Sequence, residues 1–312
     1  MSIRVAGGLV LLLSMTGLRV EAQGAAGAKG PETRMVVSVA DHLSHKPKTL
    51  TLEDIRSIGP SMRVTKVEPL QGDRELFILI DDGAGFDFGE KVQDLRRFVN
   101  NQPASAAIGV AYFTDGDLKI AQTPTRDHEL VEKAIRAPKG GKLASSFCAL
   151  SSLILGWSPG VAAREVIMIT SGIDYSGTPG GVCTNAEIAI ADAQRAGVRV
   201  YAIYHPVADY AKQDWRQIDE GLIELSHVCY ESGGEACFVS HGPLEIIGPF
   251  LRDISDHLAN QYVLTISVES IRQSGFQRVL LDTGVDGPEL MAPARVWAES
   301  PAALGGRVTS GR

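Results

Sequence analysis

Aromatic residues are scarce in this sequence, and no cluster of basic residues stands out. Only 6% of the 312 residues are aromatic, and 30 Lys and Arg residues face 37 Asp and Glu, for a formal net charge of -7. The missing basic cluster argues against a nucleic acid or an anionic membrane as partner. The remaining composition, 44% hydrophobic and 21% charged, is that of an ordinary globular protein. The length suits one large α/β domain or a domain with small appendages.

Several motifs that would indicate an enzyme are also missing. The first buried apolar run ends in Asp81-Asp82-Gly83, and the loop lacks the Lys and hydroxyl residue of a phosphate-binding GxxxxGK[ST] motif. A phosphatase with an aspartate nucleophile would place a second Asp where Gly83 stands. The sequence has no G-x-S-x-G serine elbow and no H-E-x-x-H zinc motif. An enzyme is therefore the last of three functional classes, because no nucleophile–base pair is evident.

The N-terminal stretch has the pattern of a signal peptide. Arg4 precedes the apolar run Val5–Leu13, and Val20-Glu21-Ala22 supplies a small-residue cleavage pattern. The apolar run is too short for a permanent membrane-spanning helix, and no later segment is apolar enough to be one. We expect residues 1–22 to be removed and the mature protein to be secreted or periplasmic, without an integral membrane segment. The alternative is an uncleaved amphiphilic anchor.

Cysteines are few. The chain has four, Cys148, Cys183, Cys229 and Cys237, and all lie in the mature part. An even number in an oxidising compartment fits two disulfides, of which four cysteines allow three pairings. Four reduced, buried cysteines are nearly as well supported. Metal binding by the cysteines is disfavoured, because the sequence has no C-x-x-C pair and no nearby His ligands.

From Glu75 onward, apolar runs of strand length alternate with segments of helical periodicity. Asp115-Gly116 between two such runs predicts a tight hairpin, and Thr125 is the expected cap of the helix that follows. The predicted strands are 76–80, 107–113, 118–121, 165–170, 198–204 and 237–239. The predicted helices are 87–99, 127–136, 147–157, 185–196, 214–229 and one opened by Pro249.

This order predicts an α/β fold: a doubly wound, mostly parallel sheet with one antiparallel edge strand and helices on both faces. Short β-rich segments flank it, because residues 35–40, 62–69, 262–268 and 278–282 show strand-like alternation. We expect a flexible start and a small β-rich lead-in over 23–70. The main domain would span 71–260, with a C-terminal β extension and tail over 261–312.

Four stretches carry a resemblance to a known family. They are FILIDDGAGF, the hairpin YFTDGDLKIAQTPTRDHEL, REVIMITSGID, and VRVYAIYH followed by CYESGGEACFV. Over residues 71–260 they resemble the von Willebrand factor A-type domain, and more closely the exported bacterial proteins described as von Willebrand factor A-related. The resemblance implies a sheet whose carboxyl end binds another protein, often through a divalent cation in a metal-ion-dependent adhesion site.

Most of that adhesion site is not matched. The family pattern is Asp-x-Ser-x-Ser after the first strand, a Thr in the loop before the third helix, and Thr-Asp-Gly after the fourth strand. Asp81 holds the first position, whereas Gly83 and Gly85 replace both serines and Thr170-Ser171-Gly172 replaces Thr-Asp-Gly. Because Mg²⁺ prefers carboxylate, hydroxyl and water oxygens, we expect a degenerate site without a metal or other cofactor.

Other residues could rebuild or block this site. Ser145, Ser146 and Asp174 would restore oxygen ligands if the loops brought them in, giving low-affinity Mg²⁺ binding as the alternative. Lys142 lies in the loop that normally supplies the Thr, so its ammonium could occupy the space between Asp81 and Asp82. The other possibility is that Lys142 points into solvent. The degenerate site therefore comprises Asp81, Asp82, Lys142, Ser145, Ser146, Ser171 and Asp174.

Placed on this fold, the cysteines fall into two pairs. Cys148 begins a helix and Cys183 follows the fourth strand, both at the carboxyl end of the sheet. Cys229 ends a helix and Cys237 begins a strand, both at the opposite end. We therefore expect Cys148–Cys183 and Cys229–Cys237 disulfides.

Three functions remain in order of preference. The first is an exported binding module that contacts an unknown protein partner through the carboxyl end of the sheet. The second is a structural or scaffold component of an envelope assembly, whose flanks make the contacts while that end of the sheet is inert. The third is an uncharacterised enzyme.

Overall fold

A computed structural model describes the parts of the chain on which the architecture rests. These are residues 31–40, 49–57, 62–83, 88–114, 117–140, 145–158, 163–173, 185–205, 214–238, 246–268, 271, 273–283 and 289–300. The N-terminal stretch proposed as a signal peptide, the Asp-Gly turn of the hairpin, Lys142, Asp174 and Cys183 lie outside the described residues.

The central sheet has six strands, in the order β6-β5-β4-β7-β8-β9. All neighbours run parallel except β5 and β6, which form the antiparallel hairpin at one edge. The predicted fold class is therefore confirmed. The strands are β4 (Arg74–Asp81), β5 (Ala106–Thr114), β6 (Asp117–Thr125), β7 (Ala163–Thr170), β8 (Val198–Tyr204) and β9 (Ala236–Cys237).

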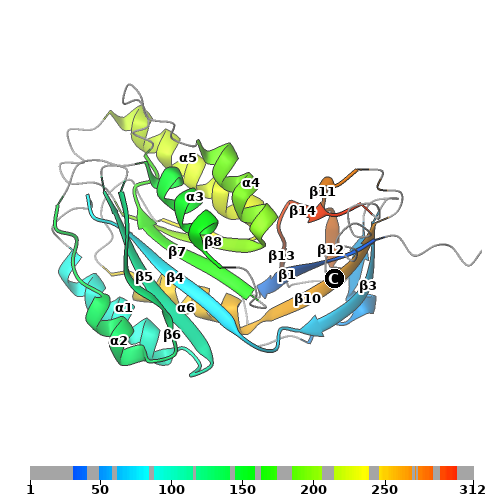
Figure 1. The fold of residues 1–312 in the computed structure, drawn as a ribbon, viewed down its shortest axis with the longest axis horizontal. Coiled ribbons are helices and arrows are strands. Elements are labelled where there is room, and N and C mark those ends of the chain that lie inside the picture. The colour runs from blue at the N-terminus through cyan, green and yellow to red at the C-terminus, as the bar shows by residue number, and fades with distance from the viewer. Residues whose placement is uncertain are drawn as a thin grey trace, which may run out of the picture.

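Helices cover both faces of this sheet (Figure 1). Because β4, β7 and β8 are apolar on both sides, each face packs its own buried cluster against three helices. One face carries α1 (Gly89–Asn101), α2 (His128–Ala134) and α6 (Gly248–Ala259). The other carries α3 (Ser146–Gly156), α4 (Ala186–Ala196) and α5 (Trp215–Ser232).

Helix α2 differs from its prediction at both ends. Its N-cap is Asp127 rather than Thr125: the Asp127 carboxylate accepts hydrogen bonds from the backbone N–H groups of Glu129 and Leu130. The Thr125 hydroxyl instead accepts a hydrogen bond from the backbone N–H of Asp127, just before the helix begins. The helix ends at Ala134 because Ile135 is extended, with φ -77° and ψ 117°. Arg136, expected in the last turn, is thereby released to turn toward the sheet.

The lead-in and the C-terminal extension meet in one sheet, here called the flank sheet (Figure 1). Its strand order is β13-β1-β10-β3, and β1 and β3 both pair antiparallel with β10. These strands are β1 (Glu32–Ala40), β3 (Met62–Pro69), β10 (Gln261–Val268) and β13 (Glu289–Met291). Two small ribbons complete the region, β2 (Ile55–Ser57) with β12 (Leu281–Thr283), and β11 (Gly275–Arg278) with β14 (Arg295–Ala298).

A buried ionic cluster joins the flank sheet to the amino end of the central sheet. Glu165 of β7 accepts hydrogen bonds from Arg199 of β8 and from Gln261 of β10, each at 3.0 Å. Arg199 also donates to the hydroxyl of Ser38 in β1 at 2.5 Å, and Arg74 of β4 donates to the Gln261 side chain at 2.8 Å. Because a buried charge without a partner is costly, these contacts fix the two sheets against each other.

Within the described part of the chain, none of the helices has the length and apolar character needed to cross a membrane.

Candidate functional site

The candidate site lies at the carboxyl end of the central sheet, which we call the sheet top. Strands β4 and β7 are neighbours there, and the chain runs from β4 toward one edge of the sheet and from β7 toward the other. Such a switch point is where open α/β sheets hold their ligands. Asp81 ends β4 and is followed by Asp82, and Thr170 ends β7 and is followed by Ser171. All four side chains are buried.

Asp82 is paired with an arginine that the sequence did not suggest. Arg136 donates from Nη1 to Asp82 Oδ1 at 2.6 Å and from Nη2 to Oδ2 at 2.8 Å. The backbone N–H of Lys139 donates to Asp82 Oδ1 at 3.1 Å. Both oxygens of this carboxylate are therefore engaged in a two-pronged, charge-assisted contact.

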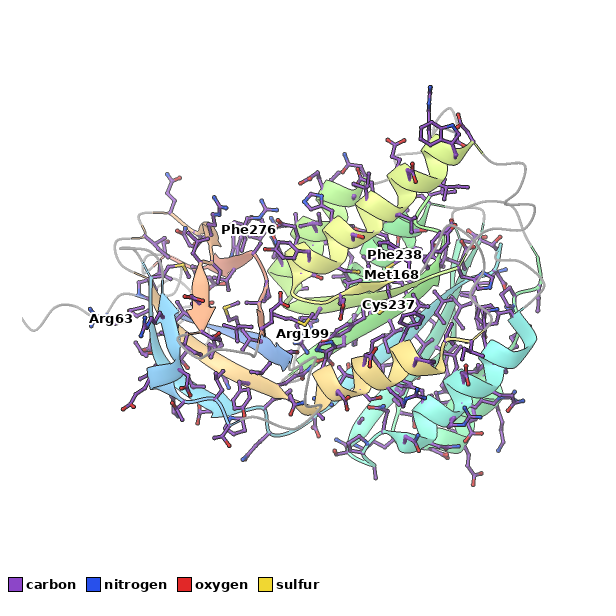
Figure 2. The ribbon with its side chains drawn as sticks, turned by 180° about the vertical axis from the view of Figure 1, so that it is seen from behind. Arg63, Met168, Arg199, Cys237, Phe238 and Phe276 are labelled. Carbon is purple, nitrogen blue, oxygen red and sulfur yellow. The ribbon has the colours of Figure 1, made fainter. Side chains whose placement is uncertain are left out.

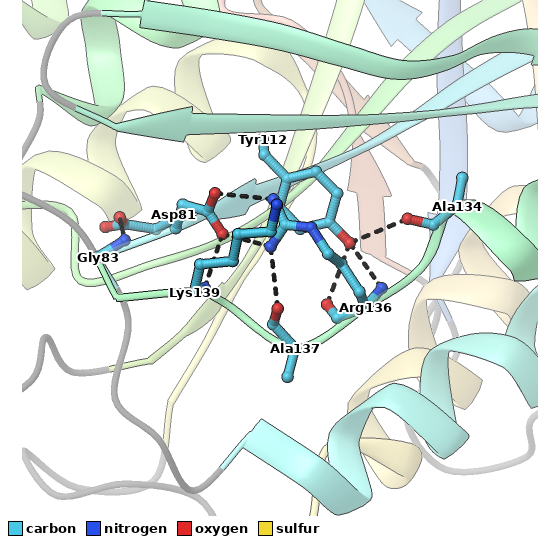
Figure 3. Close-up of polar contacts among 8 residues, drawn as sticks. Asp81, Gly83, Tyr112, Ala134, Arg136, Ala137 and Lys139 are labelled. Carbon is cyan, nitrogen blue, oxygen red and sulfur yellow. Dashed lines mark hydrogen bonds and ion pairs between the residues drawn. The ribbon is translucent and has the colours of Figure 1, made fainter.

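Tyr112 of β5 holds Arg136 in place (Figure 3). The guanidinium carbon lies 3.8 Å from the centre of the Tyr112 ring, in cation–π geometry. The Arg136 backbone N–H donates to the Tyr112 hydroxyl at 2.7 Å, and that hydroxyl lies 3.2 Å from the Ala134 carbonyl oxygen. The segment after α2 is thus anchored at both its backbone and its side chain.

The two neighbouring carboxyl groups have opposite pKa shifts. Burial raises the pKa of Asp81 to about 7, although hydrogen bonds from Gly83 and Thr170 oppose the shift and the Asp82 charge adds to it. Burial alone would also raise the pKa of Asp82. The hydrogen bonds and charge of Arg136, with the Lys139 N–H, outweigh burial and lower the pKa of Asp82.

A chain of hydrogen bonds connects Asp81 to the end of β7 and the start of α3. The Gly83 N–H donates to Asp81 Oδ1 at 2.8 Å, and the Thr170 hydroxyl donates to Oδ2 at 3.4 Å. The hydroxyls of Thr170 and Ser146 lie 2.6 Å apart. The ends of β4 and β7 and the start of α3 are consequently tied together below the surface.

The structure brings together only some of the residues expected from the sequence. Asp81, Asp82 and Ser146 belong to the network. Ser145 instead caps α3, accepting from the Cys148 N–H at 3.4 Å, and Ser171 accepts from the Ile173 N–H at 3.3 Å. The other two candidates, Lys142 and Asp174, lie outside the described residues.

Sequence reasoning missed Arg136 and Tyr112. Pro138 disfavours helix only at Ala137, the residue directly before it, so local sequence did not indicate that Arg136 leaves the helix. No local signal existed for Tyr112, which lies in the middle of a buried apolar strand.

The donor set of the described residues does not fit Mg²⁺. Asp82 is engaged by Arg136 and Lys139, and Asp81 by Gly83 and Thr170. The Ser146 hydroxyl, an alternative ligand, is bonded to Thr170. Mg²⁺ requires near-octahedral oxygen ligands and loses its waters reluctantly. Within the described ranges, no group of three or more His, Cys, Asp or Glu side chains is arranged to hold a metal ion.

The structure contradicts one of the two expected disulfides. Cys229 and Cys237 are buried free thiols, so the expected Cys229–Cys237 link is wrong. Cys229 packs on the face covered by α3, α4 and α5, whereas Cys237 packs on the face covered by α1 and α6. Burial raises the pKa of Cys237 to about 12 and that of Cys229 well above its usual value.

Cys148 is disulfide-bonded, and the bond's partner is not among the described residues. The Cys148–Cys183 link therefore stays a prediction.

Comparisons with solved structures give several similar folds. An aerotolerance-related membrane protein from Bacteroides fragilis matches at 14% identity and a TM-score of 0.44, over 59% of this chain and 98% of its own. A von Willebrand factor type A protein from Catenulispora acidiphila matches at 12% identity and a TM-score of 0.45, over 87% of this chain and 74% of its own. The vWF domain of the type V pili tip protein Mfa5 from Porphyromonas gingivalis matches at 9% identity and a TM-score of 0.40, over 60% of this chain and 94% of its own.

No family model matches the chain, and no curated protein sequence matches it significantly. Von Willebrand factor A domains are among the solved structures to which its fold is similar.

Proposed function

We propose that this chain is an exported binding module that contacts another protein through its sheet top, and that it does so without a divalent cation. The observation that carries the proposal is the Asp82–Arg136 pair. In a metal-dependent site, the ion neutralises the carboxylates and offers a vacant position to the partner. Here a guanidinium from the same chain provides the positive charge.

The geometry supports a preformed surface at the sheet top. Arg136 is held by Asp82 and stacked on Tyr112, yet its side chain remains 33% exposed. It therefore presents a fixed positive charge and an aromatic-backed guanidinium to a partner. Arginine is favoured at protein interfaces, and a side chain already held in one conformation loses less entropy on binding.

The same contacts disfavour an enzyme at this position. The hydroxyls of Ser146 and Thr170 are fully buried and bonded to each other. Neither is presented to a substrate as a nucleophile would be.

Site-specific photo-crosslinking in the producing cells tests the proposal. A benzophenone amino acid replaces Lys139, an exposed residue beside Asp82, or Asn101, an exposed residue at the far end of α1. We expect a discrete protein adduct from position 139 that persists in EDTA, and none from position 101. An adduct that forms only with added Mg²⁺, or equally from both positions, would contradict the proposal.

The scaffold alternative has an observation in its favour. The flank sheet has a buried apolar core of its own, and its edge strand β3 exposes Lys66 with 61% of its side chain accessible. The same crosslinker at position 66 separates the two functions. Adducts from position 66 and none from position 139 would mean that the flank sheet, and not the sheet top, contacts the partner.

Export belongs to the proposal as well. The pattern around Arg4, Val5–Leu13 and Ala22 supports cleavage, so the mature chain is expected to begin near Gln23. N-terminal sequencing of protein recovered from the envelope or medium tests this expectation. Intact Met1 on protein from the soluble cytoplasm would contradict it.

A further inference from the structure

A groove lies at the other end of the molecule from the sheet top, where the flank sheet meets the central sheet. It has a volume of about 420 Å³ and is formed by the first half of β1, the end of α4, the start of β8, and β14. Arg199 marks the junction in Figure 2, with Phe276 of the neighbouring β11–β14 ribbon nearby. We call it the edge groove.

Strand β1 presents an unpaired backbone edge to this groove. On one side β1 pairs with β10 from Glu32 to Ser38, but on the other side it pairs with β13 only from Ser38 to Ala40. The Val39 N–H donates to Asn260, and the Val268 N–H donates to the Pro31 carbonyl, so odd-numbered residues of β1 bond toward β10.

Backbone groups alternate in direction along a strand. Those of Arg34 and Val36 therefore point away from β10, into the side on which no described strand pairs with them. An unpaired edge of this kind is a template for strand addition.

Two buried side chains that line the edge groove have polar atoms without hydrogen-bond partners in the described structure. Gln194, 5% exposed, uses its amide nitrogen to donate to the Glu231 carbonyl at 2.7 Å, which leaves Oε1 without a donor. Arg199, 2% exposed, uses Nη1 and Nη2 on Ser38 and Glu165, which leaves Nε without an acceptor. Buried polar groups in native proteins are normally satisfied, so each atom marks a hydrogen bond that the described structure leaves unmade.

The charge of the lining indicates the chemistry of that ligand. Although the chain carries a net charge of -7, four arginines and two carboxylates line the edge groove; Arg199 is already paired with Glu165, and Arg295 Nε lies 3.9 Å from Glu231. Arg195 also lies over the Trp297 ring, 4.9 Å from its centre, and so extends the cationic wall. The charged residues of the lining are Arg34, Arg195, Arg199, Arg295, Glu32 and Glu299.

We propose that the edge groove binds an extended, acidic segment of a partner protein, which adds as a strand to β1. The segment's backbone pairs with that of Arg34 and Val36. Its carboxylates lie against Arg195 and Arg295. This site is separate from the sheet top and does not depend on the function proposed there.

Fluorescence anisotropy on the full mature chain tests the proposal. The probe is a labelled eight-residue peptide of alternating Glu and Val, compared with a Lys/Val peptide and with a Glu/Pro peptide that cannot complete a strand ladder. We expect saturable binding of the Glu/Val peptide alone, weakening as salt is raised. Arg195→Gln and Arg295→Gln should each weaken it about tenfold, because each removes a charge-assisted contact.

Two variants distinguish strand addition at the open edge of β1 from binding by charge attraction alone. Val36→Pro removes a backbone N–H on the open edge, a position where proline is tolerated, and should abolish binding while circular dichroism and the melting temperature stay near those of wild type. Arg97→Gln, which removes an exposed arginine from α1 on the far side of the central sheet from α4, should leave binding unchanged. Should Val36→Pro not fold, a Glu/Val peptide methylated at alternate backbone nitrogens provides the same test, with loss of binding expected.

The proposal is overturned by the absence of saturable Glu/Val binding, or by equal binding of the Lys/Val or Glu/Pro peptide. It is also overturned if glutarate alone competes fully, since that would make the groove a small-anion site.

Discussion

Asparagine in place of Asp81 should stabilise the protein at pH 8 and do so less as the pH falls toward 4. The Asp81→Asn side chain has the same shape, so its amide oxygen accepts from the Gly83 N–H and its amide nitrogen donates to the Thr170 hydroxyl. Both contacts of the wild-type carboxyl survive. What the substitution removes is the buried negative charge.

The size of the effect follows from the pKa. The ordinary value is 3.8, and burial raises it to about 7 in the folded chain. A carboxyl whose pKa is higher when folded holds its proton more tightly in the native state. Its contribution to stability is therefore complete below pH 3.8, and is lost as the pH rises to about 7. The resulting penalty is about 2 kcal/mol at pH 5 and about 4 kcal/mol at pH 8. Wild type should lose about 2–3 kcal/mol relative to Asp81→Asn over this interval.

Urea unfolding of both proteins at pH 5, 6, 7 and 8, with EDTA present, measures this difference. The matched control is Asp82→Asn, whose wild-type carboxylate has a lowered pKa and an arginine partner. That variant should be less stable than wild type at pH 8, by about 1–3 kcal/mol, because Arg136 loses its ionised partner. Parallel stability curves for wild type and Asp81→Asn, or an asparagine variant less stable at pH 8, would refute the reasoning.

Two further predictions concern packing and cysteine chemistry. Gly221→Ala should destabilise the protein by about 1–3 kcal/mol in urea unfolding, since an added Cβ would lie 2.9 Å from the Ser171 carbonyl oxygen. Gly156→Ala, where a Cβ meets nothing within 4 Å, should be neutral or slightly stabilising, and an equal cost in both variants would contradict the packing argument. Non-reducing peptide mapping should find Cys148 linked to Cys183, with Cys229 and Cys237 alkylated only after unfolding; a Cys229–Cys237 peptide would contradict this.

The central sheet could be predicted because its strands are continuous apolar runs. The run 76–80 is buried on both faces, and such a pattern has few alternatives at strand length. The hairpin was equally predictable from the sequence, since Asp115-Gly116 tolerates the backbone conformation of a tight turn.

The end of α2 could not be predicted in the same way. Val131 and Ile135 are four residues apart and both fully buried, so the helical pattern continues past the point where the helix ends. The end is set instead by tertiary contacts, namely those of Arg136 with Asp82 and Tyr112. The Arg136 contact with Asp82 was therefore not expected from the sequence, whereas Asp81 itself was placed correctly at the end of β4.

The pairing of strands that lie far apart in the sequence could not be predicted from local patterns either. Glu32 of β1 pairs with Ser267 of β10, and nothing in either alternating segment specifies the other. The Cys229–Cys237 error has a related cause. Strand β9 has only two residues, and its register beside Ile203 turns Cys237 to the face opposite Cys229.

Calorimetric titration of the mature protein with Mg²⁺ tests the central claim most directly. If Arg136 neutralises the sheet top, wild type should show no saturable heat up to several times the physiological concentration of roughly 1 mM. Arg136→Met, which frees the Asp82 carboxylate, should gain weak binding that Asp81→Ala removes again. Saturable 1:1 binding by wild type below roughly 1 mM, lost in Asp81→Ala, would contradict the account.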